Sequence, residues 1–287
     1  MPRLRRLRFL AVGAGVVGLA VACAVAAPWL APGDPYRQAI GDRLQPPVWG
    51  ADGSWTHPLG TDPLGRDILS RIIYGARISI SAGASAVAVS MVLGVLMGLL
   101  AGYFRGTVDA AISNLVDVML AFPFLLLALA AVAALGPGFG NMIVVLGLTG
   151  WPIYTRVVRA ETLKYREREF VLAARALGVG SARILRAHVF PNLVNTIIVM
   201  ASLEVARMII LESFLSFLGL GIQPPTPSWG SMLGEGRVYM LTHWWLATFP
   251  GAAIFLTTLG INLFGDGLRD VLDPHRVLTS TAAARTE

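Results

Sequence analysis

Long stretches with few or no charged residues dominate the chain and mark candidate membrane helices. They occupy residues 9–31, 79–101, 111–133, 139–158, 194–218 and 246–267. A helix that crosses the hydrocarbon core of a bilayer needs roughly 20 predominantly apolar residues, and each stretch is about that long. The pattern therefore predicts an all-α integral membrane protein with about six transmembrane helices.

The overall composition agrees with this prediction. Of the 287 residues, 55% are hydrophobic and 14% are charged, and the mean hydropathy is +0.66. These values are far from those of an ordinary soluble domain. The net charge of +6 does not indicate nucleic-acid binding, because no stripe of basic and aromatic residues accompanies it.

Basic residues predict the orientation of the chain. Arg3, Arg5, Arg6 and Arg8 precede the first apolar stretch, and Lys and Arg concentrate on the cytoplasmic side of membrane proteins. We therefore expect the N-terminus in the cytoplasm, and six spans return the C-terminus to the same side. A cleaved signal peptide is the alternative for the first stretch, but that stretch is long enough to span and further spans follow.

With this orientation the chain divides into four parts. We expect a cytoplasmic tail with the first helix (1–33), an extracytoplasmic segment (34–78), a helical core (79–274) and a cytoplasmic tail (275–287). The extracytoplasmic segment is rich in Pro, Gly, Asp and Trp, which predicts irregular structure, and an amphipathic helix over residues 66–74 should follow it. Within the core, residues 159–193 form the longest cytoplasmic loop.

This loop carries a helical pattern that a membrane span does not need. The residues from Tyr165 to Leu177 are good helix formers. Helical spacing places four apolar side chains on one face: Phe170, Ala173, Ala174 and Leu177. The loop should therefore present an apolar surface to something other than its own spans.

A glycine divides the loop into two short helices. Gly178 supplies a left-handed helix stop, and Ser181 is the expected N-cap of a second helix that ends near Pro191, where the chain returns to the membrane. Two such helices form a small apolar protrusion bordered by basic residues, which fits a groove on a partner protein. It equally fits an amphipathic hairpin lying on lipid headgroups, and the residues alone do not decide between the two.

The loop resembles the cytoplasmic coupling loop of ABC importer permeases, whose pattern is E-A-A-x3-G-x9-I-x-L-P. Ala173, Ala174, Gly178 and Pro191 stand at the matching positions. The chain departs from the pattern at three others, which are Leu172 for Glu, His188 for Ile and Phe190 for Leu. The missing Glu removes any charge contact that this position would make with an ATPase.

The resemblance covers residues from about 57 to 274. The segments "HPLGTDPLGRDILSRIIYGARISI", "DVMLAFPFLLLALA", "ESFLSFLGLGIQPPTPSWGSMLGEGR" and "FPGAAIFLTTLGINLFGDGLRDVLDP" are similar to the C-type permease subunit of the dipeptide, oligopeptide and nickel family. The resemblance implies a six-helix permease that pairs with a homologous second permease. It also implies two cytoplasmic ATPases, which bind ATP and Mg²⁺, and an extracytoplasmic substrate-binding protein.

The sequence itself indicates that this chain is not the ATPase. A phosphate-binding P-loop requires G-x-x-x-x-G-K-[ST], and the only lysine, Lys164, follows Leu163. The four histidines are scattered without metal-ligand spacing, and no Ser, His and Asp pattern of a hydrolase is visible. We therefore expect neither an enzyme, a metal site nor a bound cofactor.

Two groups of residues are candidates for function. The coupling candidates are the four residues that match the loop pattern together with two of their neighbours, Phe170 and Arg175. The pathway candidates are polar residues inside predicted spans, where a charge costs roughly 3 kcal/mol: Asn114, Asp117, Glu204, Arg207 and Glu212. Glu204 and Arg207 are three residues apart and can pair. Such groups line a polar passage, contact the partner permease or form a structural ion pair buried within the subunit.

The predicted function is therefore a permease subunit in a bacterial inner membrane, part of an ATP-driven importer of di- or oligopeptides or similar solutes. The alternative is a membrane scaffold whose loop recruits a partner without forming a translocation path. The permease alone does not name its cargo, because a separate binding protein selects it.

Overall fold

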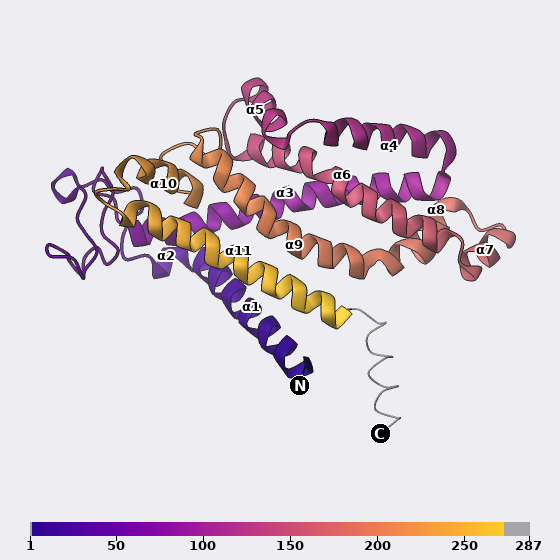
Figure 1. Ribbon diagram of the computed structural model, residues 1–287, viewed down its shortest axis with the longest axis horizontal. Helices are drawn as coiled ribbons and strands as arrows, with labels where there is room; N and C mark the ends of the chain where they lie inside the picture. Colours follow the sequence, from indigo (N-terminus) through magenta and orange to yellow (C-terminus); the bar gives the residue numbers. More distant parts are fainter. Residues whose placement is uncertain (1, 273–287) are drawn as a thin grey trace.

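The computed structural model describes residues 2–272, whose regular elements are helices (Figure 1). The longer helices are α1 (Pro2–Val25), α3 (Ile68–Phe104), α4 (Gly106–Ala121), α5 (Phe124–Leu135), α6 (Phe139–Arg166), α9 (Phe190–Phe217) and α11 (Trp245–Leu272). The shorter ones are α2 (Ala27–Leu30), η1 (Ile40–Asp42), α7 (Glu169–Ala176), α8 (Ser181–Ile184), η2 (Leu185–Val189), α10 (Trp229–Gly236) and η3 (Arg237–Tyr239). The predicted tail 275–287 lies outside the described residues.

Within residues 2–272, four helices are long and apolar enough to cross a membrane. They are α1 from Arg8 onward, α3, the continuous helix Ser181–Phe217 and α11. The pair α4 and α5 makes a fifth if it is counted as one span, but the two helices are bent by 92°. The remaining predicted stretch, 139–158, lies in the 28-residue helix α6. All six predicted stretches therefore coincide mainly with helices, although 9–31 and 111–133 each contain a break.

The expected unbroken helix over 111–133 is wrong in one respect. Phe122 and Pro123 are extended, with ψ of 134° and 128°, and they separate α4 from α5. A proline disfavours the helical conformation of the residue before it, and its own nitrogen cannot donate to a preceding turn. The break therefore follows from Pro123.

The expected separation between a short outer helix at 66–74 and a span at 79 is also wrong. α3 begins at Ile68 and continues for 37 residues to Phe104. Asp67 caps it by accepting a hydrogen bond from the Ser70 amide at 2.7 Å, as expected for an N-cap carboxylate. One helix therefore extends from the irregular segment 31–67 through the whole length of the bundle.

α3 and α6 approach each other closely because glycines line their interface. A Cβ added at Gly94 would lie 2.4 Å from the Cβ of Tyr154, and one added at Gly98 would lie 2.7 Å from the Cβ of Val158. Gly102 makes the same kind of approach to Thr162, at 2.6 Å. Small residues spaced by four bring membrane helices into backbone contact, and this spacing fixes α6 along α3.

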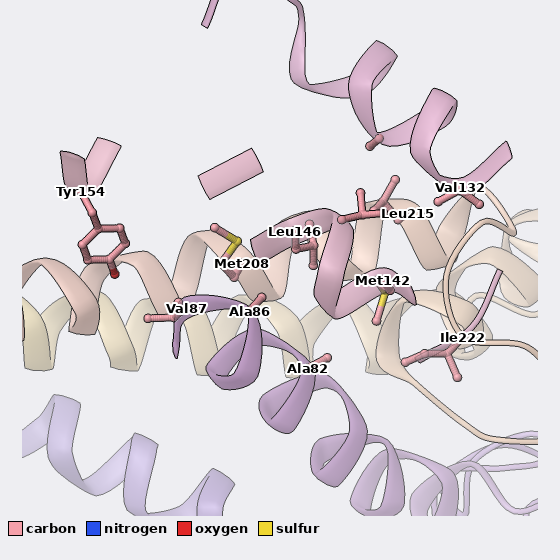
Figure 2. Packing of buried hydrophobic residues seen from close by; sticks show 12 residues of the cluster. Ala82, Ala86, Val87, Val132, Met142, Leu146, Tyr154, Met208, Leu215 and Ile222 are labelled. Atoms are coloured by element: carbon pink, nitrogen blue, oxygen red, sulfur yellow. The ribbon is translucent and has the colours of Figure 1, made fainter. Parts of the chain in front are cut away.

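The largest hydrophobic cluster lies where α3, α6 and α9 meet. Figure 2 shows Ala86 of α3, Leu146 of α6 and Met208 of α9 pointing toward one another. All three are almost fully buried, at 0%, 0% and 1% exposure. α1 and α11 pack side by side against this group (Figure 1).

The segments outside the long helices gather at two opposite ends of the molecule. Figure 1 shows the segment 31–67 and α10 at one end of the long axis, and α7 and α8 at the other. α9 connects the two ends, because it continues from α8 and η2 and finishes beside α10. The fold therefore places the candidate coupling loop far from the segment 31–67.

Candidate functional sites

The candidate coupling loop folds as a helical hairpin, defined here as residues 169–189. α7 ends at Ala176, and Gly178 follows with φ of +75°. The amide of Gly178 donates to the Arg175 carbonyl at 3.0 Å, and that of Val179 donates to the Ala174 carbonyl at 3.1 Å. This pair of bonds is a Schellman motif, so the predicted left-handed stop at Gly178 is confirmed.

The second helix of the hairpin differs from the prediction. Gly180, not Ser181, is the N-cap, and no side chain caps the helix there. Pro191 does not end the helix either, because Ser181–Phe217 runs continuously into α9. Residues 185–189 adopt a π-helical turn just before this proline. A locally widened helix accommodates a residue that lacks an amide hydrogen.

Apolar side chains on the inner face hold the hairpin against the bundle. Val171, Ile184 and Val189 are fully buried, and Ala174 is 7% exposed. They form one cluster with residues of α3, α6 and α9, including Leu99. The prediction that Ala174 shares the free apolar face is therefore wrong, since Ala174 faces the bundle. The burial makes the hairpin a firmly attached part of the molecule.

The outer face of the hairpin is also apolar, but it is exposed rather than packed against the described part of the chain. Phe170 is 44% exposed and Leu177 is 84% exposed, and Ala173 lies between them on the exposed side of α7. The Arg175 guanidinium lies over the ring of Tyr103, 5.4 Å from its centre, within the range of a cation–π contact. The hairpin thus offers an apolar surface next to a positioned positive charge.

The pathway candidates of α4 lie on its surface. Asn114 is exposed. Asp117 pairs with Arg156 of α6 at 2.7 Å, and both side chains are more than half exposed. The sequence did not reveal this pair, because its members are 39 residues apart. These residues face outward, away from the packed centre of the chain.

The pathway candidates of α9 have two different environments. Glu204 and Arg207 form the predicted ion pair at 3.1 Å, with Glu204 14% exposed and Arg207 44% exposed. Glu212 is completely buried and accepts hydrogen bonds from the hydroxyls of Ser216 at 2.8 Å and Ser213 at 3.3 Å. The structure therefore does not bring the five candidates together.

A cavity of about 470 Å³ lies between α6, α9 and α11, and Asn195 and Thr196 of α9 contribute to its wall. Among the described residues, the five pathway candidates take no part in its lining. Sequence reasoning missed the cavity, since nothing in the pattern shows which polar residues of a helix meet at an opening between neighbours.

Sequence reasoning also missed a network of four charged residues at the end that carries the segment 31–67. Asp62 accepts from Arg66 Nε at 2.5 Å and also from Arg71. Glu235 of α10 accepts from Arg66 at 2.9 Å and from Arg71 at 2.8 Å. Asp62 and the two arginines are at most 5% exposed. Buried charges require such pairing, but the partners are up to 169 residues apart in sequence.

Another ion pair fastens α4 to α6. Asp109 accepts two hydrogen bonds from Arg159, one of them at 2.7 Å. Bidentate pairs of this kind combine charge with directional bonding. Within residues 2–272 no three His, Cys, Asp or Glu side chains are grouped as a metal site would need.

A bundle of long apolar helices, with a firmly attached hairpin at one end and a charged network at the other, is the architecture of a multi-pass membrane protein. The chain belongs to the family of binding-protein-dependent transport system inner membrane components, whose model matches residues 90–277. The model of the N-terminal TM domain of oligopeptide transport permease C matches residues 1–47.

Several curated proteins are similar to almost the whole chain. The di/tripeptide transport system permease protein DppC of Pseudomonas aeruginosa is 46% identical over 89% of this chain and 84% of its own length. The dipeptide transport system permease protein DppC of Escherichia coli is 46% identical over 92% of this chain and 88% of its own length. The glutathione permease GsiD of Pectobacterium atrosepticum is 45% identical over 92% and 86%.

A solved structure has the same fold at low sequence identity. A chain of the MetNI methionine ABC transporter, in inward-facing conformations, aligns with a TM-score of 0.58 and 16% identity. The alignment covers 71% of this chain and 96% of that one. This likeness shows the fold, and the family match and the relatives show the function. The predicted class, an all-helical permease of the ABC importer type, is therefore confirmed.

Proposed function

We propose that this chain is one permease half of an ATP-driven importer of di- or oligopeptides, or of solutes of similar size, in a bacterial inner membrane. Its partners are a homologous second permease, two cytoplasmic ATPases that bind ATP and Mg²⁺, and an extracytoplasmic binding protein. The names of the relatives support this cargo, because dipeptides, tripeptides and glutathione are all short peptide-like molecules.

The proposed orientation places both termini and the hairpin in the cytoplasm. The first stretch follows a run of arginines, and the hairpin carries three more, Arg175, Arg183 and Arg186. Both features agree with the excess of positive charge on the inner side of membrane proteins. The segment 31–67 and α10 then face the binding protein on the outer side.

The single observation that carries the proposal is the exposed apolar face of a hairpin that is itself firmly held. Leu177, at 84% exposure, is the most exposed apolar side chain of the hairpin. A large apolar side chain in this position loses contact with water when a partner covers it, which favours binding. Because Val171 and Ile184 fix the hairpin to the bundle, a movement of the partner also moves α9.

A pair of matched variants tests this role. Leu177→Asp places a charge in the proposed ATPase contact, whereas Leu241→Asp makes the same change at the opposite end of the molecule, where Leu241 is fully exposed. The ATPases should co-purify with the Leu241→Asp permease at the wild-type ratio. Leu177→Asp should reduce that ratio by about tenfold or more, as for a residue at the centre of an interface.

Equal recovery of the ATPases with both variants would show that the hairpin is not their binding site. A scaffold, the alternative function, would lose its partner in the same experiment. Transport separates the two. Vesicles with the complete assembly should accumulate a labelled dipeptide when ATP is present, and uptake should stop when hydrolysis is blocked. A scaffold would show no ATP-dependent uptake.

A further inference from the structure

α10 is anchored at its N-terminal end to the interior of the membrane bundle. Its first amide, that of Trp229, donates to the hydroxyl of Ser79 in α3 at 3.2 Å. The hydroxyls of Ser79 and Ser228 also interact with the carboxyl group of Glu212 in α9. Ser79, Ser228 and Glu212 all have 0% exposure. One buried carboxyl thus joins α3, α9 and the start of α10.

α10 is anchored at its other end to the segment 31–67. Glu235, in its last turn, accepts from Arg66 at 2.9 Å and from Arg71 at 2.8 Å and 3.2 Å. Both arginines also bond Asp62, which lies in the irregular part of the chain. The side chain of Glu235 is 30% exposed, whereas those of the other three are at most 6% exposed. Glu235 is therefore the member of the network that a protein outside can reach.

Between its ends α10 lies directly on its neighbours. A Cβ added at Gly230 would be 2.4 Å from the Ser213 carbonyl oxygen of α9, and one at Gly234 would be 3.0 Å from the Phe217 carbonyl oxygen. Contacts this close between backbones leave no room for α10 to slide along α9. Packed interfaces of this kind move as a unit or change discretely.

We propose that α10 is a strut that transmits docking of the binding protein at the segment 31–67 to α9, with Glu235 and Glu212 as the positioning residues at its two ends. This inference rests on the proposed function. Docking would cover Glu235 and exclude water from it, and ion pairs strengthen when solvent no longer screens them. The stronger ion pairs of Glu235 then shift the position of α10. Glu212 and the glycine contacts transmit this shift to α9.

The proposal concerns coupling between sites, so its test compares stimulated with basal activity. The complete transporter in lipid nanodiscs is assayed for ATP hydrolysis without binding protein and over a range of concentrations of substrate-loaded binding protein. The variants are Glu235→Gln, Glu212→Gln and the double variant. Asp266→Asn, which alters an exposed carboxylate of α11, is the matched control for replacing a carboxylate by an amide.

We expect each single variant to lower the maximal stimulated rate by about tenfold, within the usual range of coupling between sites. The basal rate and the half-saturating concentration of binding protein should stay near wild type. The double variant should have the same maximal stimulated rate as the more strongly affected single variant. A helix already released at one end transmits nothing, so its release at the other end causes no further loss. Asp266→Asn should behave as wild type.

Three results would overturn the proposal. Multiplicative effects in the double variant would show that the two carboxylates act independently. A raised half-saturating concentration with an unchanged maximal rate would make Glu235 a docking contact. A parallel fall of basal and stimulated rates would make both residues merely structural.

If a glutamate variant fails to assemble, Ser79→Ala replaces it, because this change removes one hydroxyl and keeps both carboxylates. A stimulated rate equal to wild type in Ser79→Ala would likewise contradict the strut. A wild-type transporter that binding protein does not stimulate would instead count against the proposed function.

Discussion

The close approach of α3 and α6 at Gly98 predicts a measurable loss of stability when one methyl group is added. In Gly98→Ala the new Cβ would lie 2.7 Å from the Cβ of Val158 and 2.9 Å from the Thr155 carbonyl oxygen. Carbon atoms in ordinary contact are about 3.5–4.0 Å apart. The two helices must therefore separate by roughly 1 Å along this line, and the contacts on either side of Gly98 loosen with them.

The magnitude follows from two opposing effects. Overpacking a well-packed interface costs about 1–3 kcal/mol, and alanine recovers up to about 1 kcal/mol through its better helix propensity. With the overpacking cost taken at the middle of its range, about 2 kcal/mol, the net loss is about 1–2 kcal/mol. For a chain of this size each 1 kcal/mol lowers the melting temperature by about 2–4 °C, so we expect a decrease of about 2–8 °C.

Thermal unfolding of the purified permease in detergent, followed by tryptophan fluorescence, measures this decrease. The matched control is Gly15→Ala in α1, where an added Cβ has no neighbour within 4 Å. The control should melt at or slightly above the wild-type temperature. If Gly98→Ala has the same melting temperature as the control, the α3–α6 packing does not limit stability and the explanation is wrong.

Three further predictions concern single contacts. Asp109→Asn removes one charge of the Asp109–Arg159 pair, which is partly solvated, so the free energy of unfolding should fall by about 1 kcal/mol. Hydrogen exchange along α4 should become faster, and unchanged exchange would exclude a role for the pair in holding α4. Gly178→Ala should cost about 1–2 kcal/mol because an L-residue resists φ of +75°, whereas Gly180→Ala, at φ of −62°, should be nearly neutral in the same thermal assay; equal effects would contradict this explanation. Ser90→Ala removes a buried hydrogen bond of 2.9 Å to α6 and should lower stability by only about 0.6 kcal/mol, so a loss of several kcal/mol would show that more than this bond depends on the hydroxyl.

The apolar pattern was sufficient to predict the class of fold and the left-handed stop at Gly178, because both depend on local sequence. The spacing of Gly94, Gly98 and Gly102 is also visible in the sequence and predicts a close helix contact, although it does not name α6 as the partner. The break at Pro123 had a local signal, the proline itself, that hydropathy alone concealed.

Contacts between distant parts of the chain could not be predicted in this way. Glu212 was recognised as unusual because it is a charge inside an apolar stretch, but its serine partners come from three separate segments. Arg66 and Arg71 lie in a segment that reads as surface, and their burial depends on Glu235, far along the chain. Pairings of this kind are decided by tertiary packing, which a single sequence does not record.

The unbroken helix from Ser181 to Phe217 has a geometric consequence. It contains 37 residues, and at 1.5 Å per residue it is about 55 Å long. Tilting a rod of that length by about 10° around one end displaces the other end by about 10 Å. Leverage of this size means that a modest rotation at the hairpin can open or close a passage wide enough for a small solute while every backbone hydrogen bond of the helix stays intact.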